Sequence, residues 1–359
     1  MALVHGDPSS SMPEAERQRL ESLIAASCAR DGVDIHHGNP EYWRARYAAS
    51  AECGGGAGSG DWVCSFGAVG EAFAEEVDRG ARILHIGCGD SVFAAEMHSA
   101  GFTDSLHTDF DAGVIEQQRK RSASLKWAAL DACDMAACDA ASYDAVVDKG
   151  CLDIFLPILM GAVTSEAEEE QMLANAGRML REVWRVLRPG GKYICISLHV
   201  HSALVLRACS GMRHTVRFGG DGFAQVHSGS EEAGLLAELR SALHADTDGS
   251  GGKRAPALLH TCTKPAPAAA APPPPMWDLA EYRAACNDLD RSMLAQQRPE
   301  ALLVLLGLLG WCGLRYAGHD AEAAALISVL AVVYGIRVYL RTAFRADAAR
   351  AGSKAWLFS

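Results

Sequence analysis

The chain has 359 residues, 49% of them hydrophobic, which suits a globular protein of one large domain or two smaller ones. Its 33 basic and 44 acidic residues give a formal net charge of −11, which argues against a nucleic-acid partner because phosphate binding requires a basic surface. The 12 cysteines form no Cys-x-x-Cys pair and have no histidine partner at zinc-ligand spacing, so we expect buried, reduced thiols and no metal site.

The N-terminal part of the chain predicts one amphipathic helix, over residues 12–30, which begins at Ser11 and Pro13. The first dozen residues have no basic segment followed by an apolar one, so we expect no secretory signal and a cytoplasmic protein. We assign residues 1–38 to an N-terminal helical extension.

A glycine turn follows the first predicted strand and opens a helix. Gly87 and Gly89 let the main chain turn sharply and approach a ligand with no Cβ in the way. Asp109 ends the next apolar run, 20 positions after Gly89, where a carboxylate can accept hydrogen bonds from two ribose hydroxyls. Val92 stands where a dinucleotide site has a third glycine. The pattern therefore favours a nucleoside without phosphates, such as S-adenosylmethionine.

Three further apolar runs predict strands at residues 125–130, 143–147 and 192–198. The first ends in Asp131 and the second in Asp148, and a helix predicted over residues 168–187 precedes the third. Strands that alternate with helices imply a parallel sheet with right-handed crossovers. Ligands bind beyond the carboxyl ends of such strands, where the glycine turn and the aspartates fall.

Four motifs are specific enough to indicate a family: Glu41-Tyr-Trp43-Arg-Ala-Arg-Tyr47, Asp61-Trp62, Gly87-Cys-Gly-Asp-Ser91 and Val147-Asp-Lys-Gly-Cys-Leu-Asp153. Together they resemble the seven-stranded, S-adenosylmethionine-dependent methyltransferases that modify eukaryotic elongation factor 1-alpha on lysine. The resemblance runs from about Asn39 to Lys264. It implies an α/β fold, a Rossmann-like seven-stranded sheet with helices on both faces.

The resemblance also implies roles for individual residues around S-adenosylmethionine. Aromatic side chains wrap the cofactor from the N-terminal side, Asp109 with Phe110 takes the ribose, and Asp131 with Ala132 takes the adenine edge. The full set is Trp43, Tyr47, Trp62, Gly87, Cys88, Gly89, Asp109, Phe110, Asp131, Ala132 and Lys149. Two departures leave the substrate open: Cys151 replaces the family's usual threonine, and a glycine- and serine-rich insertion covers residues 219–253.

Methyl transfer to a lysine requires a neutral amine, and uncharging one at pH 7 costs about 4.6 kcal/mol from a reference pKa of ~10.4. A narrow apolar channel lowers that pKa by desolvation. Asp148 and Asp153 are expected to flank the acceptor mouth, and with Lys149 they are the candidate catalytic residues. Asp153 is alternatively a helix N-cap, and Lys149 a partner of Asp148 or of the cofactor carboxylate. The aromatic faces either stabilise the sulfonium, by about 0.5–2 kcal/mol each, or pack the N-terminal segment onto the sheet.

The composition changes after Lys264. Residues 265–275 are a proline- and alanine-rich tract that predicts a semi-rigid linker between a methyltransferase domain over residues 39–264 and a helical region over residues 276–359. In that region, two apolar stretches at residues 301–318 and 323–340 predict a membrane hairpin over residues 301–340. Arginines outside the hairpin place the enzyme in the cytoplasm. A soluble hairpin that docks or dimerises is the alternative.

Three classes of function stay open at this point. The first is a protein-lysine methyltransferase with an elongation factor 1-alpha-like substrate, which the resemblance implies. The second is a methyltransferase acting on a small molecule or lipid at a membrane, and the third is a cofactor-binding interaction protein without turnover. The same fold serves the first two classes, so the fold cannot decide between them.

Overall fold

The computed structural model describes most of the chain between Gly38 and Asn287, together with scattered residues from Gln18 to Ala29. The described ranges are 18–19, 22–23, 25–26, 28–29, 38–52, 63–157, 165–218, 225–227, 258–266, 273 and 275–287. The chain divides into two compact units, Met1–Cys286 and Asn287–Ser359. The predicted hairpin over residues 301–340 lies in the second unit and outside the described residues.

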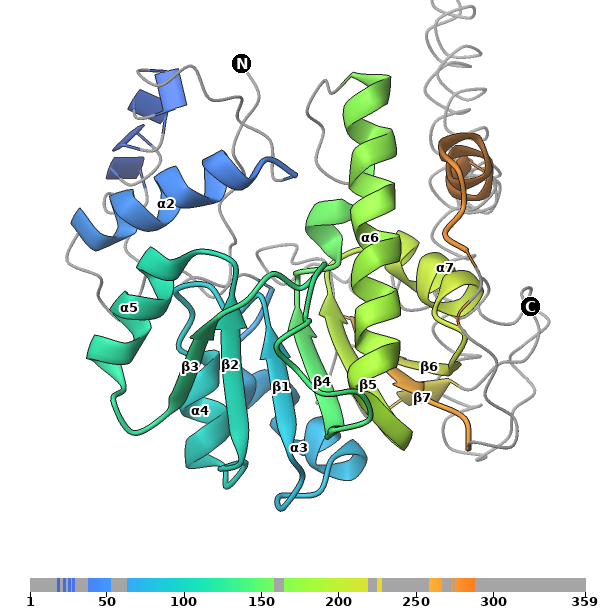
Figure 1. Ribbon diagram of the computed structural model, residues 1–359, viewed down its shortest axis with the longest axis horizontal. Helices are drawn as coiled ribbons and strands as arrows, with labels where there is room; N and C mark the ends of the chain where they lie inside the picture. Colours follow the sequence, from blue (N-terminus) through green and yellow to red (C-terminus); the bar gives the residue numbers. More distant parts are fainter. Residues whose placement is uncertain are drawn as a thin grey trace, which may run out of the picture. The chain divides into compact units, whose positions relative to one another are not determined.

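Five parallel strands form the predicted core of the sheet (Figure 1). They are β1 (Ile83–Ile86), β2 (Ser105–Asp109), β3 (Lys126–Ala129), β4 (Tyr143–Lys149) and β5 (Leu187–Ser197). Their order in space is β3-β2-β1-β4-β5. Successive strands are added on one side of β1 up to β3, and then on its other side from β4, so the strand order reverses between β1 and β4. Such a switch point is where α/β sheets bind ligands.

The other half of the sheet is antiparallel. β8 (Leu258–Thr263) lies between β5 and β6 (Arg213–Phe218) and runs antiparallel to both. β7 (Gln225–His227) pairs with β6 at the edge and comes from the insertion at residues 219–253. It gives the described sheet eight strands, one more than the seven predicted. The fold is a Rossmann-like mixed sheet.

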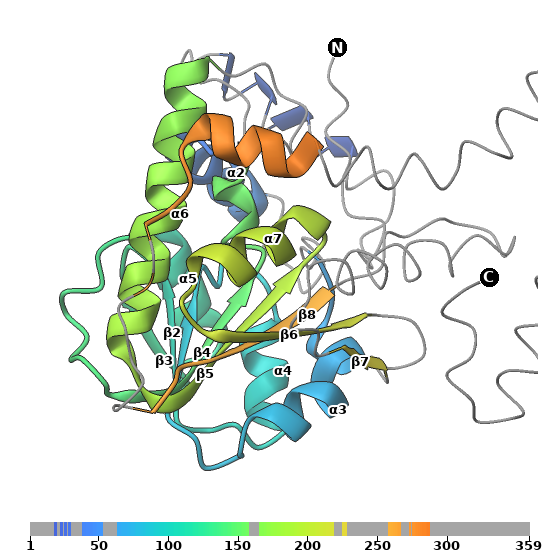
Figure 2. The same cartoon turned by 90° about the vertical axis from the view of Figure 1, so that its right-hand side faces the viewer.

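Helices cover both faces of the sheet, as predicted (Figure 2). Neighbouring strand residues point to opposite faces, so each strand contributes to two apolar clusters. One cluster joins the helices α3 (Phe66–Glu76) and α4 (Phe93–Ser99) to Ile83, Ala145, Val147, Ile194 and Ile196. The other joins α6 (Glu166–Val186) and α7 (Val200–Cys209) to Leu84, Ile86, Val146, Tyr193 and Cys195.

The long helix α6 agrees closely with the predicted helix over residues 168–187. A capping box begins the helix. Ser165 Oγ accepts from the Glu168 N–H, and the Glu168 carboxylate accepts from the Ser165 N–H. At the other end Leu187 already pairs with Tyr143, so β5 begins directly after the helix and not at residue 192 as predicted, and the segment Pro189-Gly-Gly191 lies inside the strand. A register shift between Tyr143 and Ala145 accommodates it.

The segment after the proline tract belongs to the first unit, which extends the domain beyond the predicted limit at Lys264. Residues 279–287 are helical, and Leu279, Tyr282 and Cys286 are buried in the cluster under α6 and α7. Arg283 Nη2 also pairs with Glu169 Oε2 of α6 at 2.6 Å. The apolar residues recur at helical spacing, which is why this short segment packs onto the domain.

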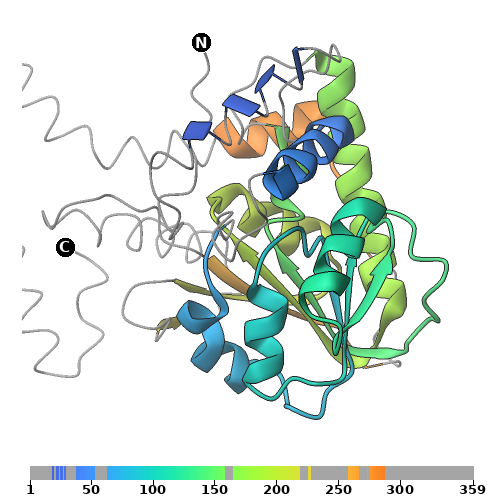
Figure 3. The same ribbon diagram turned by 90° about the vertical axis from the view of Figure 1, so that its left-hand side faces the viewer.

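Helix α2 (Pro40–Glu52) lies over α5 (Ala112–Arg121) near the carboxyl ends of the strands (Figure 3). In the N-terminal extension, the residues that are described between Gln18 and Ala29 are helical. Within the described ranges, no helix has the length and apolar character needed to cross a bilayer.

Candidate functional site

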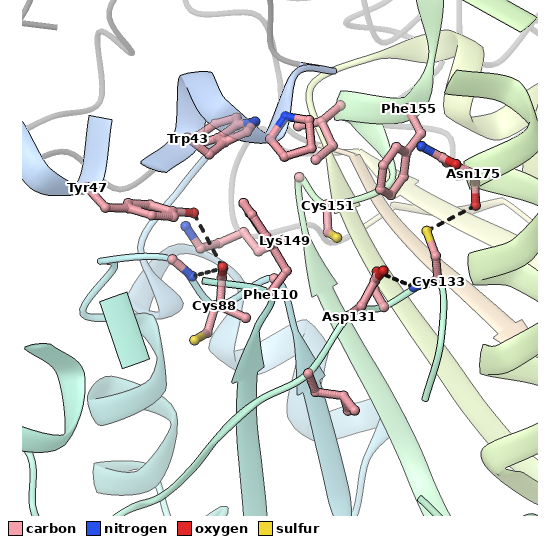
Figure 4. Close-up of a pocket in the computed structure, with 18 of the residues that line it drawn as sticks. Trp43, Tyr47, Cys88, Phe110, Asp131, Cys133, Lys149, Cys151, Phe155 and Asn175 are labelled. Atoms are coloured by element: carbon pink, nitrogen blue, oxygen red, sulfur yellow. Dashed lines mark hydrogen bonds between the residues drawn. The ribbon is translucent and has the colours of Figure 1, made fainter. Parts of the chain in front are cut away.

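A pocket lies at the carboxyl ends of β1, β2, β3 and β4, with α2 and α6 contributing to its walls (Figure 4). It brings together every predicted cofactor residue that the structure describes. These are Trp43, Tyr47, Gly87, Cys88, Gly89, Asp109, Phe110, Asp131, Ala132 and Lys149. Trp62 lies outside the described residues, so its predicted role stays a prediction.

The glycine turn has a backbone that favours glycine at two positions. Gly87 and Gly89 have φ angles of +60° and +52°, in the left-handed region that other residues rarely adopt. A Cβ on Gly87 would lie 2.7 Å from Cys151 Cβ, so the turn after β4 packs directly against the turn after β1. The space beside Gly87 is therefore filled by Cys151, and the approach of the turn to a ligand stays a prediction.

Asp109 is the buried acceptor at the end of β2, with 3% of its surface exposed. Its Oδ2 accepts from the Gly89 N–H at 3.0 Å, and its Oδ1 accepts from the Asp111 N–H at 3.1 Å. The Tyr47 hydroxyl donates a longer bond of 3.4 Å to Oδ2. Burial raises the pKa of this carboxyl to about 6, although the backbone hydrogen bonds oppose the shift.

Trp43 and Tyr47 of α2 form an aromatic wall and also pack the helix onto the domain. Their ring centroids are 6.0 Å apart, and the Arg46 guanidinium lies 6.0 Å from the Trp43 ring. Both rings belong to an apolar cluster with Val114 and Ile115 of α5. The Ser50 hydroxyl fixes the same helix to the glycine turn by donating to Asp90 Oδ2 at 2.7 Å. The two predicted roles of these aromatics are thus compatible.

The opposite wall contains residues that the sequence did not indicate. Phe155, from the 3-10 helix η1 (Asp153–Phe155), lines the pocket together with Asn175 and Arg178 of α6 (Figure 4). Cys133 follows the β3 carboxylate Asp131, and its Sγ donates to the Asn175 carbonyl at 3.4 Å. Asn175 and Arg178 are three positions apart on one face of α6, a pattern that any polar helix surface shows, so no sequence signal singled them out.

Asp148 does not reach the acceptor mouth that was expected of it. It is fully buried and does not line the pocket. Its carboxylate accepts from the Cys151 N–H at 2.6 Å, from the Leu152 N–H at 3.0 Å and from the Tyr193 hydroxyl at 2.6 Å. Burial raises its pKa to about 7 despite these bonds. The carboxylate holds the turn after β4 in shape.

Asp153 likewise lies behind the pocket wall, with 1% of its surface exposed. Its carboxylate accepts from Ser197 Oγ at 2.6 Å and from the Leu198 N–H at 3.2 Å, so it ties η1 to the end of β5. It is also not an N-cap, because Leu152 occupies that position of η1. Burial raises the pKa of Asp153 to about 7. Of the three candidate catalytic residues, Lys149 is the one that the structure places on the pocket.

These residues fit S-adenosylmethionine. The buried Asp109 carboxylate suits ribose hydroxyls, and Gly87 and Gly89 bring their main chain to the pocket without side chains of their own. The aromatic wall suits a sulfonium. Lys149 is 6% exposed, lines the pocket and carries a charge opposite to that of a carboxylate ligand.

Residues 84–195 match the family described as a methyltransferase domain. The match runs from β1 to β5 and includes the glycine turn, Asp109, Asp131 and Lys149. The match confirms, for this part of the chain, the resemblance to methyltransferases that the motifs predicted.

Proteins similar to the chain include elongation factor 1A methyltransferases, which confirms the predicted resemblance. The "eEF1A lysine and N-terminal methyltransferase" of Bos taurus is 36% identical over 121 residues, which are 33% of this chain and 16% of the relative. The protein of the same name from Mus musculus is 30% identical over 165 residues, 45% of this chain and 22% of the relative. "EEF1A lysine methyltransferase 4" of Bos taurus is 28% identical over 160 residues, 44% of this chain and 60% of the relative. The chain thus matches less than two thirds of each of these relatives.

Proposed function

We propose that the chain transfers a methyl group from S-adenosylmethionine to a lysine of a protein substrate similar to elongation factor 1A. The observation that carries this proposal is the buried Asp109 carboxylate, which faces the pocket beyond β2 and is bonded to the glycine turn. The named activities of the relatives support the choice of a protein lysine as acceptor.

When bound, S-adenosylmethionine supplies a methyl group that is activated by the adjacent sulfonium. Asp109 and Phe110 would bind the ribose, Asp131 and Ala132 the adenine edge, and Lys149 the carboxylate of the methionine portion. Trp43 and Tyr47 would face the sulfonium and exclude water. In-line transfer depends on alignment of the donor and acceptor more than on acid or base catalysis.

The acceptor amine must lose its proton before it can attack, which costs about 4.6 kcal/mol at pH 7. Ile154 and Phe155 line the pocket and provide an apolar wall that would lower the amine's pKa by desolvation. Asp148 and Asp153 lie behind that wall, so we assign them the role of holding the turns that carry Lys149 and Phe155. The proton then leaves to water.

Labelled cofactor distinguishes the three classes of function. The full chain is incubated with whole-cell extract and S-adenosylmethionine carrying a tritiated methyl group, and the products are separated into protein and organic phases. Label on a protein band, released as methyl-lysine on hydrolysis, supports the proposal. Label in the organic phase would favour a small-molecule or lipid substrate, and label in neither phase would favour a binding protein without turnover. The Asp109→Ala variant is the matched negative control.

We also propose that residues 301–340 anchor the enzyme to a membrane with the catalytic domain in the cytoplasm. The proposal rests on two apolar stretches of 18 residues, each carrying a single arginine near its C-terminal end. Cell fractionation of the full chain is compared with a chain that ends at Asn287, which keeps the packed helix over residues 279–287. The longer chain alone should sediment with membranes, and recovery of both in the supernatant contradicts the anchor.

A further inference from the structure

The glycine turn is held from behind by two side chains of α5. Gln118 Nε2 donates to the Gly89 carbonyl at 2.9 Å and to the Ser91 carbonyl at 2.7 Å. Arg121 Nη1 donates to the carbonyl of Asp90 at 2.7 Å, and to Gln118 Oε1 at 3.3 Å. Three consecutive carbonyls of the turn are therefore bonded to one helix. Gln118 and Arg121 do not line the pocket.

These bonds close a ring around Gly89. Its N–H donates to Asp109 Oδ2, and Asp109 Oδ1 accepts from the N–H of Asp111, the residue that N-caps α5. The helix then returns to the carbonyl of Gly89 through Gln118. Both peptide groups of Gly89 are thus fixed by the continuous segment that starts at the end of β2 and carries the ribose acceptor.

We propose that Gln118 and Arg121 are positioning residues, here called the carbonyl clamp, that set the distance between the glycine turn and the Asp109 carboxylate for cofactor binding. This proposal rests on the proposed function, because it assumes that the glycine turn and the Asp109 carboxylate bind the same adenosyl ligand. Because the carbonyls of the turn are bonded to α5, Gly89 and the Asp109 carboxylate beside it can both face the pocket.

The burial of Gln118 explains why the clamp matters. Gln118 is 2% exposed, so removal of its amide leaves the carbonyls of two partly buried residues without that donor. The turn would then shift to satisfy them, since buried carbonyls are nearly always bonded. Gln118→Met keeps a similar length and volume but removes both hydrogen bonds to the turn and the longer one accepted from Arg121, so it tests the bonds without opening a large cavity.

The test uses the full chain with S-adenosylhomocysteine as the calorimetric probe. Gln118→Met and Arg121→Met should each weaken its binding by about 5- to 20-fold, the range for one or two net hydrogen bonds. Arg121→Lys keeps a donor and should recover most of the affinity. Lys120→Met is the matched control, because Lys120 lies on the same helix with a side chain that is 76% exposed. In turnover assays, KM for the methyl donor should rise while kcat and KM for the acceptor stay close to those of the parent.

Hydrogen exchange of the ligand-free protein separates this inference from the proposed function. Amides of residues 89–91 should exchange faster in Gln118→Met and Arg121→Met than in the parent and the Lys120→Met control, whether or not any cofactor binds. Unchanged exchange and unchanged affinity in both variants would overturn the clamp. If the parent fails to bind S-adenosylhomocysteine, the proposed function fails, while the exchange data still decide whether the clamp holds the turn. If Gln118→Met does not fold, Arg121→Met against Arg121→Lys gives the same decision.

Discussion

The backbone N–H of Gly89 donates to Asp109 Oδ2 at 3.0 Å, which joins the turn after β1 to the last residue of β2. The other carboxylate oxygen accepts from the Asp111 N–H at 3.1 Å. Two backbone amides therefore orient the carboxylate before any ligand arrives. Because the same group is buried and has a raised pKa, cofactor binding should depend on pH.

Cofactor affinity should fall below about pH 6. Burial raises the pKa of Asp109 to about 6, and only the ionised carboxylate can accept bonds from both ribose hydroxyls. Binding favours the form without the proton, so affinity is constant above pH 7 and falls by up to about tenfold per pH unit below the pKa. Calorimetry of S-adenosylhomocysteine from pH 5 to pH 8 measures this. A flat profile over that range contradicts the assignment of Asp109 to the ribose.

Replacement of Asp109 by alanine should abolish cofactor binding. The substitution removes the proposed ribose acceptor and leaves the Gly89 and Asp111 N–H groups without this partner. Asp111→Asn is the control, because an asparagine side chain can still accept from the Val114 N–H and cap α5. Calorimetry should detect no binding to Asp109→Ala and near-parental binding to Asp111→Asn. Retention of affinity by Asp109→Ala removes the main support for the proposed site.

Gly87→Ala should destabilise the domain more than Gly190→Ala. Both glycines have positive φ angles, +60° and +78°, so each alanine costs about 1–2 kcal/mol in backbone conformation. A Cβ on Gly190 meets nothing within 4 Å, whereas one on Gly87 lies 2.7 Å from Cys151 Cβ. Unfolding by urea measures the difference between the two variants. Adding Cys151→Gly to Gly87→Ala should recover the part of the stability loss that the clash causes. Equal stabilities of Gly87→Ala and Gly190→Ala would show that no clash exists.

Asp148→Asn should lower the stability of the domain by an amount that depends on pH. The substitution weakens bonds to Tyr193, Cys151 and Leu152, at about 1–3 kcal/mol. The folded pKa of about 7 lies above the reference value of 3.8, so the protonated group stabilises the fold fully below pH 3.8. That contribution is lost as pH rises through 7. The destabilisation by Asp148→Asn should therefore shrink between pH 4 and pH 8 in urea titrations.

Tyr193→Phe is the matched control for Asp148→Asn, since it removes one donor and leaves the carboxyl group in place. It should lower stability by about 1 kcal/mol, the usual effect of one lost hydrogen bond. A deficit from Asp148→Asn that stays constant with pH would contradict the raised pKa.

The parallel strands and their terminal carboxylates could be predicted because both follow from local pattern. An apolar run that ends in Gly87 or Asp109 places that residue at the carboxyl edge of the sheet, whatever the rest of the chain does. The orientation of Asp148 could not be predicted, because it depends on Tyr193, which is 45 positions away and approaches only after β4 and β5 have paired. The position of Asp153 was predicted wrongly for the same reason, because its carboxylate is held by Ser197 at the distant end of β5.

Two features of the domain were not predicted, for different reasons. Residues 279–287 have apolar positions at helical spacing, but the preceding proline tract suggested that the domain had already ended. Gln118 and Arg121 are residues that the end of any polar helix can carry, and only the carbonyls that they meet distinguish them. Tertiary partners of this kind leave no mark on the local pattern.

The packing of Leu279, Tyr282 and Cys286 beneath α6 and α7 means that the catalytic domain is completed by a piece of chain from beyond the proline tract. A protease that cuts once between Lys264 and Pro273 would break the backbone and yet leave the fragments associated, because apolar burial and the Arg283 ion pair still connect them. The cleaved protein would then separate into two fragments under denaturing conditions but keep the mass of the intact chain in native solution. A fragment that stops at Lys264 would instead expose the apolar surface that Leu279, Tyr282 and Cys286 cover, and would tend to aggregate.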